Sequence, residues 1–302
     1  MVRRRQKTRH LWLSTRPGVE TLIDLQNSTD HRKINIDKVG VKNIRYPITV
    51  LDRAHGRQHT VATINMYVNL PQEFKGTHMS RFIEILNEYR GEIHIRSFRA
   101  ILETMNERLQ AQSAHLDVTF PYFVEKLSPV SGAAGLMEYA CRLVGSLSDE
   151  GGYDLVVEVV VPISTVCPCS KEISDFGAHN QRGVVRLAVR FSRFVWLEEL
   201  IHLVEAQASC EVYSVLKRPD EKYVTEKAYD NPKFVEDLVR DIASRLDRDD
   251  HITWYSVDAE NFESIHNHSA YAYIEREKPP LPRSKPDGPD NLPSSEEESD
   301  EG

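Results

Sequence analysis

The chain has 302 residues, of which 40% are hydrophobic and 28% charged, so it can bury a substantial core as one large domain or two ordinary ones. Its four cysteines are too few for a disulfide framework, and no apolar N-terminal segment predicts export or membrane insertion, so we expect a cytoplasmic protein. The net charge of −8 argues against a nucleic-acid-binding surface, and neither a nucleic acid nor a membrane is an expected partner.

The two ends of the chain differ in composition from its body. Residues 1–10 carry five Lys or Arg residues, and we expect residues 1–19 to form a flexible N-terminus. Residues 278–302 are rich in proline, serine and acidic residues with almost nothing apolar to bury, which predicts a disordered acidic tail.

The first half of the body alternates between strand-like and helix-like patterns. Residues 46–52 and 59–70 have apolar runs typical of strands, separated by a turn-prone segment, which predicts a hairpin. Residues 78–90 and 97–112 space their apolar side chains three and four apart, so two amphipathic helices follow, the second with Ser97 as its N-cap. Residues 114–129 and 134–148 return to strands.

The second half repeats this order at a similar length. Residues 152–165 and 183–193 predict strands, 196–209 and 231–248 helices, and 251–262 and 268–277 strands, with Asn231-Pro232 as the start of the second helix. The repetition predicts an α+β protein of two β-β-α-α-β-β units with antiparallel sheets, covering residues 20–148 and 149–277. Two polar stretches are extra in the second unit, residues 164–183 and 218–230, and such insertions usually carry function.

The first insertion, STVCPCSKEISDFGAHNQRG, holds the residues with the most distinctive chemistry. Cys167 and Cys169 point to opposite sides of an extended chain, so one thiolate is favoured as a metal ligand and the other as a neighbour with a different role. His179 follows in a glycine-containing loop that can fold back towards the thiolate. The pattern leaves three interpretations open: a catalytic metal with a third ligand from elsewhere, a redox or nucleophilic cysteine, and inert core thiols.

Carboxylates and histidines elsewhere add further candidates. Glu236 lies among apolar residues at the start of a predicted helix, where we expect it near a pocket. His266 and His268 follow Glu263 between the last two predicted strands, and a His beside a carboxylate is a common acid-base pair, although exposed loop residues would look the same.

Taken together, CPCSKEISDFGAHNQRG, LKRPDEKYVTEKAYDNPKFVED, ENFESIHNHSAYA, DLQNSTDHRKINIDKVGVKNIRYP and HTVATINMYVNLPQEFKGTHMSRF closely resemble the prokaryotic type IB GTP cyclohydrolase I family, from about residue 20 to 276. This resemblance implies a tandem tunnelling fold (T-fold), assembled as a homotetramer. It also implies conversion of GTP and water to 7,8-dihydroneopterin triphosphate and formate, the first step towards tetrahydrofolate and, in many bacteria, queuosine.

Residue roles also follow from the resemblance. It implies Cys167, His179 and Glu221 as ligands of a divalent metal, with manganese favoured and zinc or iron possible. It implies Glu236 as the carboxylate that binds guanine, and Cys169, Glu263 and His266 as acid-base or positioning residues. These roles suit the chemistry, because a bound divalent ion lowers the pKa of water for attack on carbon 8 of guanine, and a carboxylate accepts two parallel N–H bonds from its edge.

The triphosphate requires positive charge that an acidic chain must supply locally. A basic cluster at a helix start combines cations with free backbone N–H groups, which makes the following residues our candidates: Lys75, His78, Arg81, Arg182 and Lys222. Two rival functions also fit the pattern. One is an NADPH-dependent T-fold nitrile reductase with a nucleophilic cysteine and no metal, and the other is a noncatalytic purine-binding protein with a structural zinc.

Overall fold

The computed structural model describes residues 26, 28, 30–150 and 152–279. The expected flexible N-terminus, residues 1–19, and all but the first two residues of the expected acidic tail lie outside this part of the chain. Within it, the chain forms nine strands and six helices. No helix among these residues is long and apolar enough to cross a membrane.

The strands are β1 (Ile36–Asp52), β2 (Gly56–Leu70), β3 (Ser113–Leu127), β4 (Ala134–Ser148), β5 (Gly152–Val166), β6 (Asn180–Phe191), β7 (Cys210–Glu211), β8 (Ile252–Glu263) and β9 (Ala270–Glu277). The helices are α1 (Met79–Glu88), α2 (Phe98–Leu109), α3 (Pro168–Ile173), α4 (Leu197–Glu205), α5 (Arg218–Asp230) and α6 (Val235–Arg248). The α+β class is confirmed, and the β-β-α-α-β-β order occurs twice, with α3, β7 and α5 inserted in the second half.

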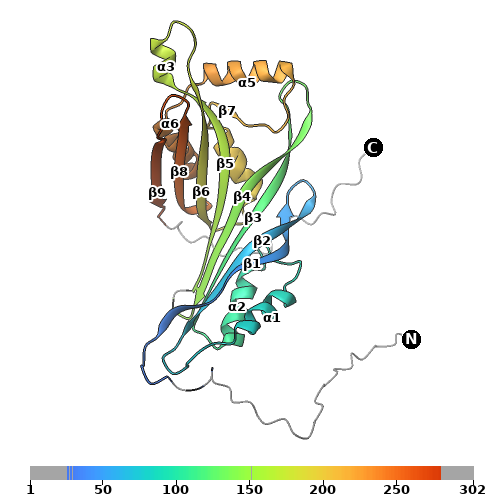
Figure 1. The fold of residues 1–302 in the computed structure, drawn as a ribbon, viewed down its shortest axis with the longest axis vertical. Helices are drawn as coiled ribbons and strands as arrows, with labels where there is room; N and C mark the ends of the chain where they lie inside the picture. The colour runs from blue at the N-terminus through green and yellow to red at the C-terminus, as the bar shows by residue number, and fades with distance from the viewer. Residues whose placement is uncertain (1–25, 27, 29, 151, 280–302) are drawn as a thin grey trace, which may run out of the picture.

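All strands belong to one antiparallel sheet with the order β1-β2-β3-β4-β5-β6-β8-β9, and β7 pairs with β5. The predicted boundary at residues 148 and 149 falls in the turn between β4 and β5, where Ser148 pairs with Gly152. The two halves therefore do not form separate sheets, because the β4–β5 hairpin joins them into one long twisted surface (Figure 1).

The helices cover one face of this sheet. Alternate strand residues such as Val118, Leu143 and Val159 are fully or almost fully buried and pack with α1, α2, α4 and α6 in one continuous core. The other face is only partly covered within the chain and exposes large apolar side chains, namely Val61, Leu136, Phe262, Tyr271 and Tyr273. The chain thus carries a sheet surface and two edge strands, β1 and β9, that its own helices do not cover.

Two local expectations need correction, and a third is confirmed in position only. β1 starts at Ile36, ten residues before the expected strand, because register shifts near Val41 break the alternation that the sequence shows. α6 starts at Val235 rather than at Asn231-Pro232, because the backbone N–H of Lys233 donates to the Val166 carbonyl (3.1 Å) and keeps this segment extended. Ser97 does occupy the N-cap position of α2, but its side chain makes no capping hydrogen bond.

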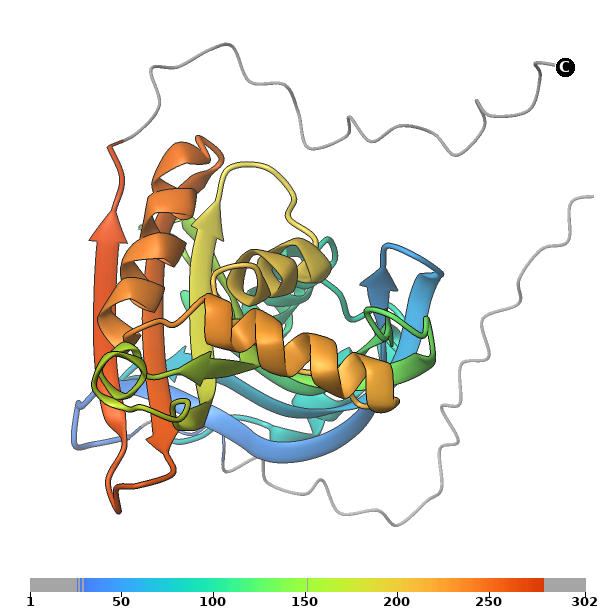
Figure 2. The ribbon, with the colours of Figure 1, turned by 90° about the horizontal axis from the view of Figure 1, so that it is seen from above.

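Helix α5 is the largest departure from the expected secondary structure. The sequence RPDEKYVTEKAYD has little apolar periodicity, and only Asp220 and Ala228 of the helix are buried. Seen from above, α5 lies across one end of the sheet, between the turn that joins β3 to β4 and the short helix α3 (Figure 2). The polar insertion therefore forms a helix that spans this end of the sheet and is attached at both of its ends.

Candidate active site

A pocket of about 440 Å³ lies where β5 and β6 end, beneath α5. Its lining comes from the strand ends, β7, α5 and the β8–β9 loop: Ser164, Val166, Ala178, His179, Asn180, Arg182, Cys210, Glu211, Val212, Tyr213, Leu216, Val224, Thr225, Ala228, Tyr229 and Ser264. Of the residues expected from the sequence, His179 and Arg182 line it directly. This is a volume within the range of small-molecule sites.

The α3 turn brings Cys167 next to His179. Cys167 is the N-cap of α3, where its Sγ accepts a hydrogen bond from the Ser170 backbone N–H (3.5 Å) and Pro168 starts the helix. The Cys167 backbone N–H donates to the His179 carbonyl (3.2 Å), and the His179 N–H donates to Ser170 Oγ (3.1 Å). The loop is therefore closed by hydrogen bonds at the point where the two side chains leave it, while Cys169 is exposed on α3.

The imidazole of His179 has a ligand position available. Its Nδ1 is buried and has no hydrogen-bond partner among the described residues. Buried polar atoms without a partner are rare in folded proteins, and a nitrogen that faces a pocket beside a thiol is suited to a borderline-soft divalent ion. The donor chemistry of Cys167 and His179 thus fits a metal at this position.

The third expected ligand, Glu221, is not brought to the other two. In the described part of the chain, no three His, Cys, Asp or Glu side chains are placed to hold one ion. Glu221 is exposed near the start of α5, about 12 Å along the helix axis from Tyr229, whose carbonyl accepts a hydrogen bond from Lys171 of α3 (2.5 Å). The start of α5 is instead fixed to the β3–β4 turn.

Asp220 makes that attachment. Its buried carboxylate accepts hydrogen bonds from the backbone N–H groups of Val130 (2.9 Å), Ser131 (2.8 Å) and Lys217 (2.7 Å), and from Ser131 Oγ (2.6 Å). These donors hold the pKa of Asp220 far below its usual value, against the effect of burial, which raises it. Glu221, Val224, Thr225 and Ala228 share one face of α5, and the last three line the pocket.

The start of α6 lies beside the end of β5. The hydrogen bond from the Lys233 N–H to the Val166 carbonyl places the segment that leads into α6 beside the residue that precedes Cys167. Glu236 is the second residue of α6, and Asp237 caps the helix by accepting from the Phe234 N–H (3.2 Å). Glu236 is exposed and is not among the residues that line the pocket described above.

Glu263 and His266 form a pair at the end of β8. His266 Nε2 lies 3.4 Å from Glu263 Oε2, and the His266 ring stacks on that of His268 with centroids 4.9 Å apart. Glu263 pairs with Gln181 across β6 and β8, which places this acid next to the strand that follows His179. The arrangement brings an imidazole and a carboxylate to the same sheet end as Cys167.

Sequence reasoning missed a row of buried polar side chains at this sheet end. At most 5% of the residue is exposed in each of Thr165, Gln181 and Asn261. Each has a side-chain oxygen without a hydrogen-bond partner among the described residues, and the Asn261 Nδ2 also lacks one. Thr165 pairs with Gln181, and Asn261 pairs with Gly183, so all of them lie on the face that α6 covers. Such unpaired donors and acceptors are available to a polar ligand.

Gly183 is part of the same row. A Cβ at this position would lie 2.4 Å from Asn261 Oδ1 and 3.0 Å from Ile163 Cγ1, so only glycine fits without displacing them. The signal in the sequence was a polar residue at inward positions of apolar strands. In β5 the signal is hidden because apolar residues occupy both faces, whereas in β8 the alternation of Ser256, Asp258 and Glu260 with buried residues shows that Asn261 is turned inwards.

The two residues of β7, the thiol Cys210 and the acid Glu211, also line the pocket. Burial acts to raise the pKa of Glu211, but the Lys227 ammonium at 2.6 Å outweighs it and holds that pKa below its usual value. Burial raises the pKa of the Cys210 thiol to about 11, so Cys210 stays protonated at neutral pH. Cys210 is therefore unsuited to act as a nucleophile.

The basic candidates are divided between the two ends of the sheet. Arg182 lines the pocket, and Lys222 is exposed on α5, 3.7 Å from Glu226. Lys75, His78 and Arg81 instead follow β2, which runs antiparallel to β5 because three antiparallel steps separate the two strands. These three residues therefore lie at the opposite end of the sheet from Cys167, as the positions of α1 and α3 in Figure 1 show, and one chain does not bring them together.

Comparison with known proteins identifies the family. The family profile described as type I GTP cyclohydrolase folE2 matches residues 22–272. The chain belongs to the type I GTP cyclohydrolase FolE2 family. A GTP cyclohydrolase FolE2 of Syntrophobacter fumaroxidans is 69% identical over 257 residues, covering 85% of this chain and all of that protein. Another, of Syntrophus aciditrophicus, is 64% identical over 256 residues, with 85% and 100% covered.

Among solved structures, a uricase from Bacillus fastidious has a similar fold, with a TM-score of 0.52, 9% sequence identity, and coverage of 82% of this chain and 94% of that one. This likeness concerns the fold alone. The family match confirms the resemblance to GTP cyclohydrolase I that the sequence shows, and it identifies the family as FolE2. The enzyme class that the resemblance implies is confirmed as well.

Proposed function

We propose that this chain hydrolyses GTP to 7,8-dihydroneopterin triphosphate and formate. The finer family designation that we propose is type IB. The product would serve the synthesis of tetrahydrofolate and of queuosine. Membership of the FolE2 family supports this reaction. The observation in the structure that supports it most is the closed loop that sets Cys167 beside His179, whose imidazole lines the pocket and has a buried Nδ1 without a partner among the described residues.

A divalent metal belongs to this proposal. Cys167 and His179 would hold it, and Glu221 is the carboxylate on the pocket-facing side of α5 that would join them. When bound, the ion supplies Lewis-acid activation of the attacking water. Manganese is favoured, and zinc and iron also suit a set of one thiolate, one imidazole and one carboxylate.

The chain's own residues would bind the base and move protons. Glu236, beside the free N–H groups of the first turn of α6, would accept the paired N–H donors of guanine, and buried Gln181 and Asn261 provide further polar atoms nearby. His266, held by Glu263, is suited to transfer protons as the ring opens and formate leaves, with exposed Cys169 as a further donor.

A complete site would require a second chain. Lys75, His78 and Arg81 can reach the triphosphate only from a partner subunit, because they lie at the opposite end of the sheet from Cys167 in their own chain. The uncovered sheet face and the two open edges support closure of a T-fold barrel between subunits, and a homotetramer is the assembly that we propose. Arg182 and Lys222 would contribute from the same chain.

The first test is a GTP turnover assay on chelator-stripped protein that is reloaded separately with manganese, zinc and iron. Formate and the fluorescence of the oxidised neopterin are followed. We expect restored turnover, and we expect Cys167→Ala to lose both bound metal and turnover, while Cys141→Ala, a buried thiol in the first half, keeps both. Folded protein that gives no product with any ion would refute the proposed reaction.

Complementation tests the shared site. A Lys75→Gln/Arg81→Gln variant and a Cys167→Ala variant are each expected to be inactive. If the triphosphate residues act across subunits, mixed tetramers regain roughly a quarter of the sites, because half of the chains supply each function. Mixed tetramers that stay as inactive as the two variants would refute the shared site.

A further inference from the structure

A second pocket lies between the strands of the first half and α4 of the second half. It has a volume of about 710 Å³ and is enclosed by the β1–β2 turn, β3, β4 and the start of α4. Its lining combines acidic, histidine and apolar side chains: Asp52, Arg53, Ala54, His55, Gln58, Tyr122, Phe123, Val124, Glu125, Leu136, Glu198 and His202. We call it the Glu198 pocket.

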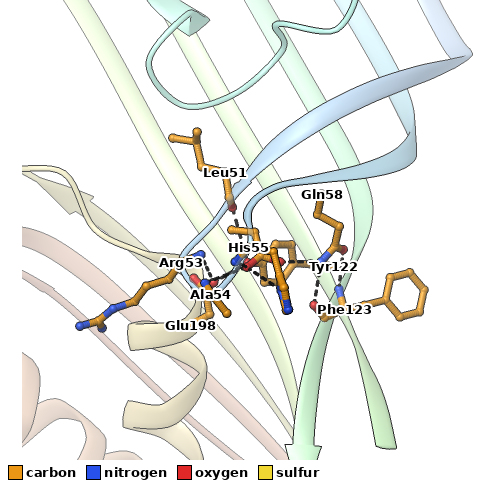
Figure 3. Close-up of polar contacts among 9 residues, drawn as sticks. Leu51, Arg53, Ala54, His55, Gln58, Tyr122, Phe123 and Glu198 are labelled. Carbon is orange, nitrogen blue, oxygen red and sulfur yellow. Dashed lines mark hydrogen bonds and ion pairs between the residues drawn. The ribbon is translucent and has the colours of Figure 1, made fainter. Parts of the chain in front are cut away.

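Glu198 is buried but only half satisfied. The residue is 8% exposed, and its Oε1 accepts hydrogen bonds from the Tyr122 hydroxyl (2.5 Å) and the Arg53 backbone N–H (2.7 Å). Figure 3 shows this carboxylate rising from α4 between Arg53 and Tyr122. Its Oε2 is buried without a partner among the residues that the structure describes. The two donors on Oε1 fix the carboxylate, which presents an unused acceptor.

The cations around the pocket are directed at other acids. The Arg53 guanidinium pairs with Glu199 (3.0 Å). His55 Nδ1 lies 3.4 Å from Asp52, and His202 Nδ1 lies 3.6 Å from Glu205. Glu198 thus lies in an acidic lining whose basic groups are already engaged. A buried acceptor without a donor is unfavourable, and more so when the group is charged, so the site favours a cationic donor.

Apolar side chains also line this pocket. Val124 is half-buried and lies on the same sheet face as Tyr122, so the pocket offers an apolar surface beside its acidic end. A long aliphatic stem with a charged head has the matching distribution of polarity. A guanidinium or primary ammonium head would give Oε2 the donor that it lacks and would offset the acidic charge.

We propose that the Glu198 pocket binds an organic cation with a guanidinium or primary ammonium head and an aliphatic stem, with Glu198 Oε2 as its main acceptor. Such a head has two sources: a free small molecule, or one of the arginines near the start of the chain, Arg3, Arg4 and Arg5. The Glu198 pocket is separate from the pocket beside His179 in the same chain, with which it shares no lining residue.

The test is calorimetric titration of the full chain with agmatine at low ionic strength. We expect saturable binding that Glu198→Gln weakens at least tenfold. The matched control is Glu103→Gln, which removes the same charge from an exposed pair with Arg99 on α2, outside the pocket; it should change the affinity less than threefold. N-butylurea, a neutral ligand of similar shape, should bind at least tenfold more weakly than agmatine.

A second variant protects the test against misfolding of Glu198→Gln. The His202 side chain is 64% exposed and lies one turn after Glu198 on α4, so His202→Arg should fold normally, place a guanidinium beside the Glu198 carboxylate and abolish agmatine binding. Replacing Arg3, Arg4 and Arg5 together with Gln separates the two sources: tighter agmatine binding identifies the chain's own arginines as the occupant, and unchanged binding identifies a free ligand. No saturable binding to either chain, or equal affinity in Glu198→Gln and Glu103→Gln, overturns the proposal.

Discussion

The buried ion pair between Lys126 of β3 and Glu205 of α4 should be a major source of stability. Lys126 Nζ lies 2.7 Å from Glu205 Oε1, and their side chains are only 12% and 4% exposed. Glu205 also accepts from the Tyr139 hydroxyl (2.7 Å), and Lys126 also donates to the Val212 carbonyl (3.0 Å). The pair therefore connects the first-half strands to α4 and to the segment that follows β7.

Glu205→Gln tests this interaction. The amide keeps an acceptor for Tyr139 but leaves the Lys126 ammonium buried without its counter-charge. Removing one partner of a buried pair costs about 3–5 kcal/mol. We expect the lower end, about 3 kcal/mol, because the ammonium keeps the Val212 carbonyl and the Tyr213 ring, whose centroid is 4.5 Å away. At about 2–4 °C per kcal/mol for a chain of this size, the melting temperature should fall by about 6–12 °C.

The assay is thermal and urea unfolding at fixed protein concentration, so that any assembly contributes equally. Glu103→Gln, which breaks the exposed pair with Arg99, should change the free energy of unfolding by less than about 0.5 kcal/mol. The double variant Glu205→Gln/Lys126→Met removes both charges and should be more stable than Glu205→Gln alone. An unchanged melting temperature in Glu205→Gln, or a double variant less stable than the single one, would show that the reasoning is wrong.

Three further predictions concern the site and the pH dependence. Glu236→Gln should abolish GTP binding but keep the bound metal, which equilibrium binding and metal analysis check; normal GTP affinity would remove Glu236 from the site. Gly183→Ala should lower GTP turnover at least about tenfold with an unchanged circular dichroism spectrum, because its Cβ would displace Asn261; wild-type turnover would contradict this. The hydrogen bond to Glu205 raises the pKa of His202 in the folded chain. The stability that this interaction contributes is complete at a pH below the pKa of His202 in the unfolded chain, and it is lost as the pH rises through the pKa in the folded chain. The difference in melting temperature between the wild type and His202→Gln should shrink from pH 6 to pH 8.5; a constant difference would refute the assignment.

The sequence predicted the order of the main elements because apolar periodicity in strands such as residues 59–70 and helices such as residues 235–248 reflects burial directly. It did not predict α5, whose place depends on one buried acid, Asp220, and on a turn about 90 residues away in the sequence. Local spacing also indicated that Cys167 and His179 are neighbours.

The rest of the site depends on tertiary packing. Gln181 and Asn261 look like ordinary strand residues, and only the register of β6 and β8 places them in one buried row. The separation of Lys75 from Cys167 follows from the number of antiparallel steps between β2 and β5, which no local pattern reveals.

The attachment of α5 to the β3–β4 turn bears on whether either half of the chain could stand alone. If the chain were cut in the loop at residues 149–151, the second fragment would carry Asp220, whereas Val130 and Ser131 would remain on the first. Neither repeat would then satisfy its own polar groups, and the new edges of β4 and β5 would be open to pairing with other chains. The two halves, which repeat the same order of elements, thus depend on each other, and a chain built from one half alone would need a different turn, or a different helix, at this end of its sheet.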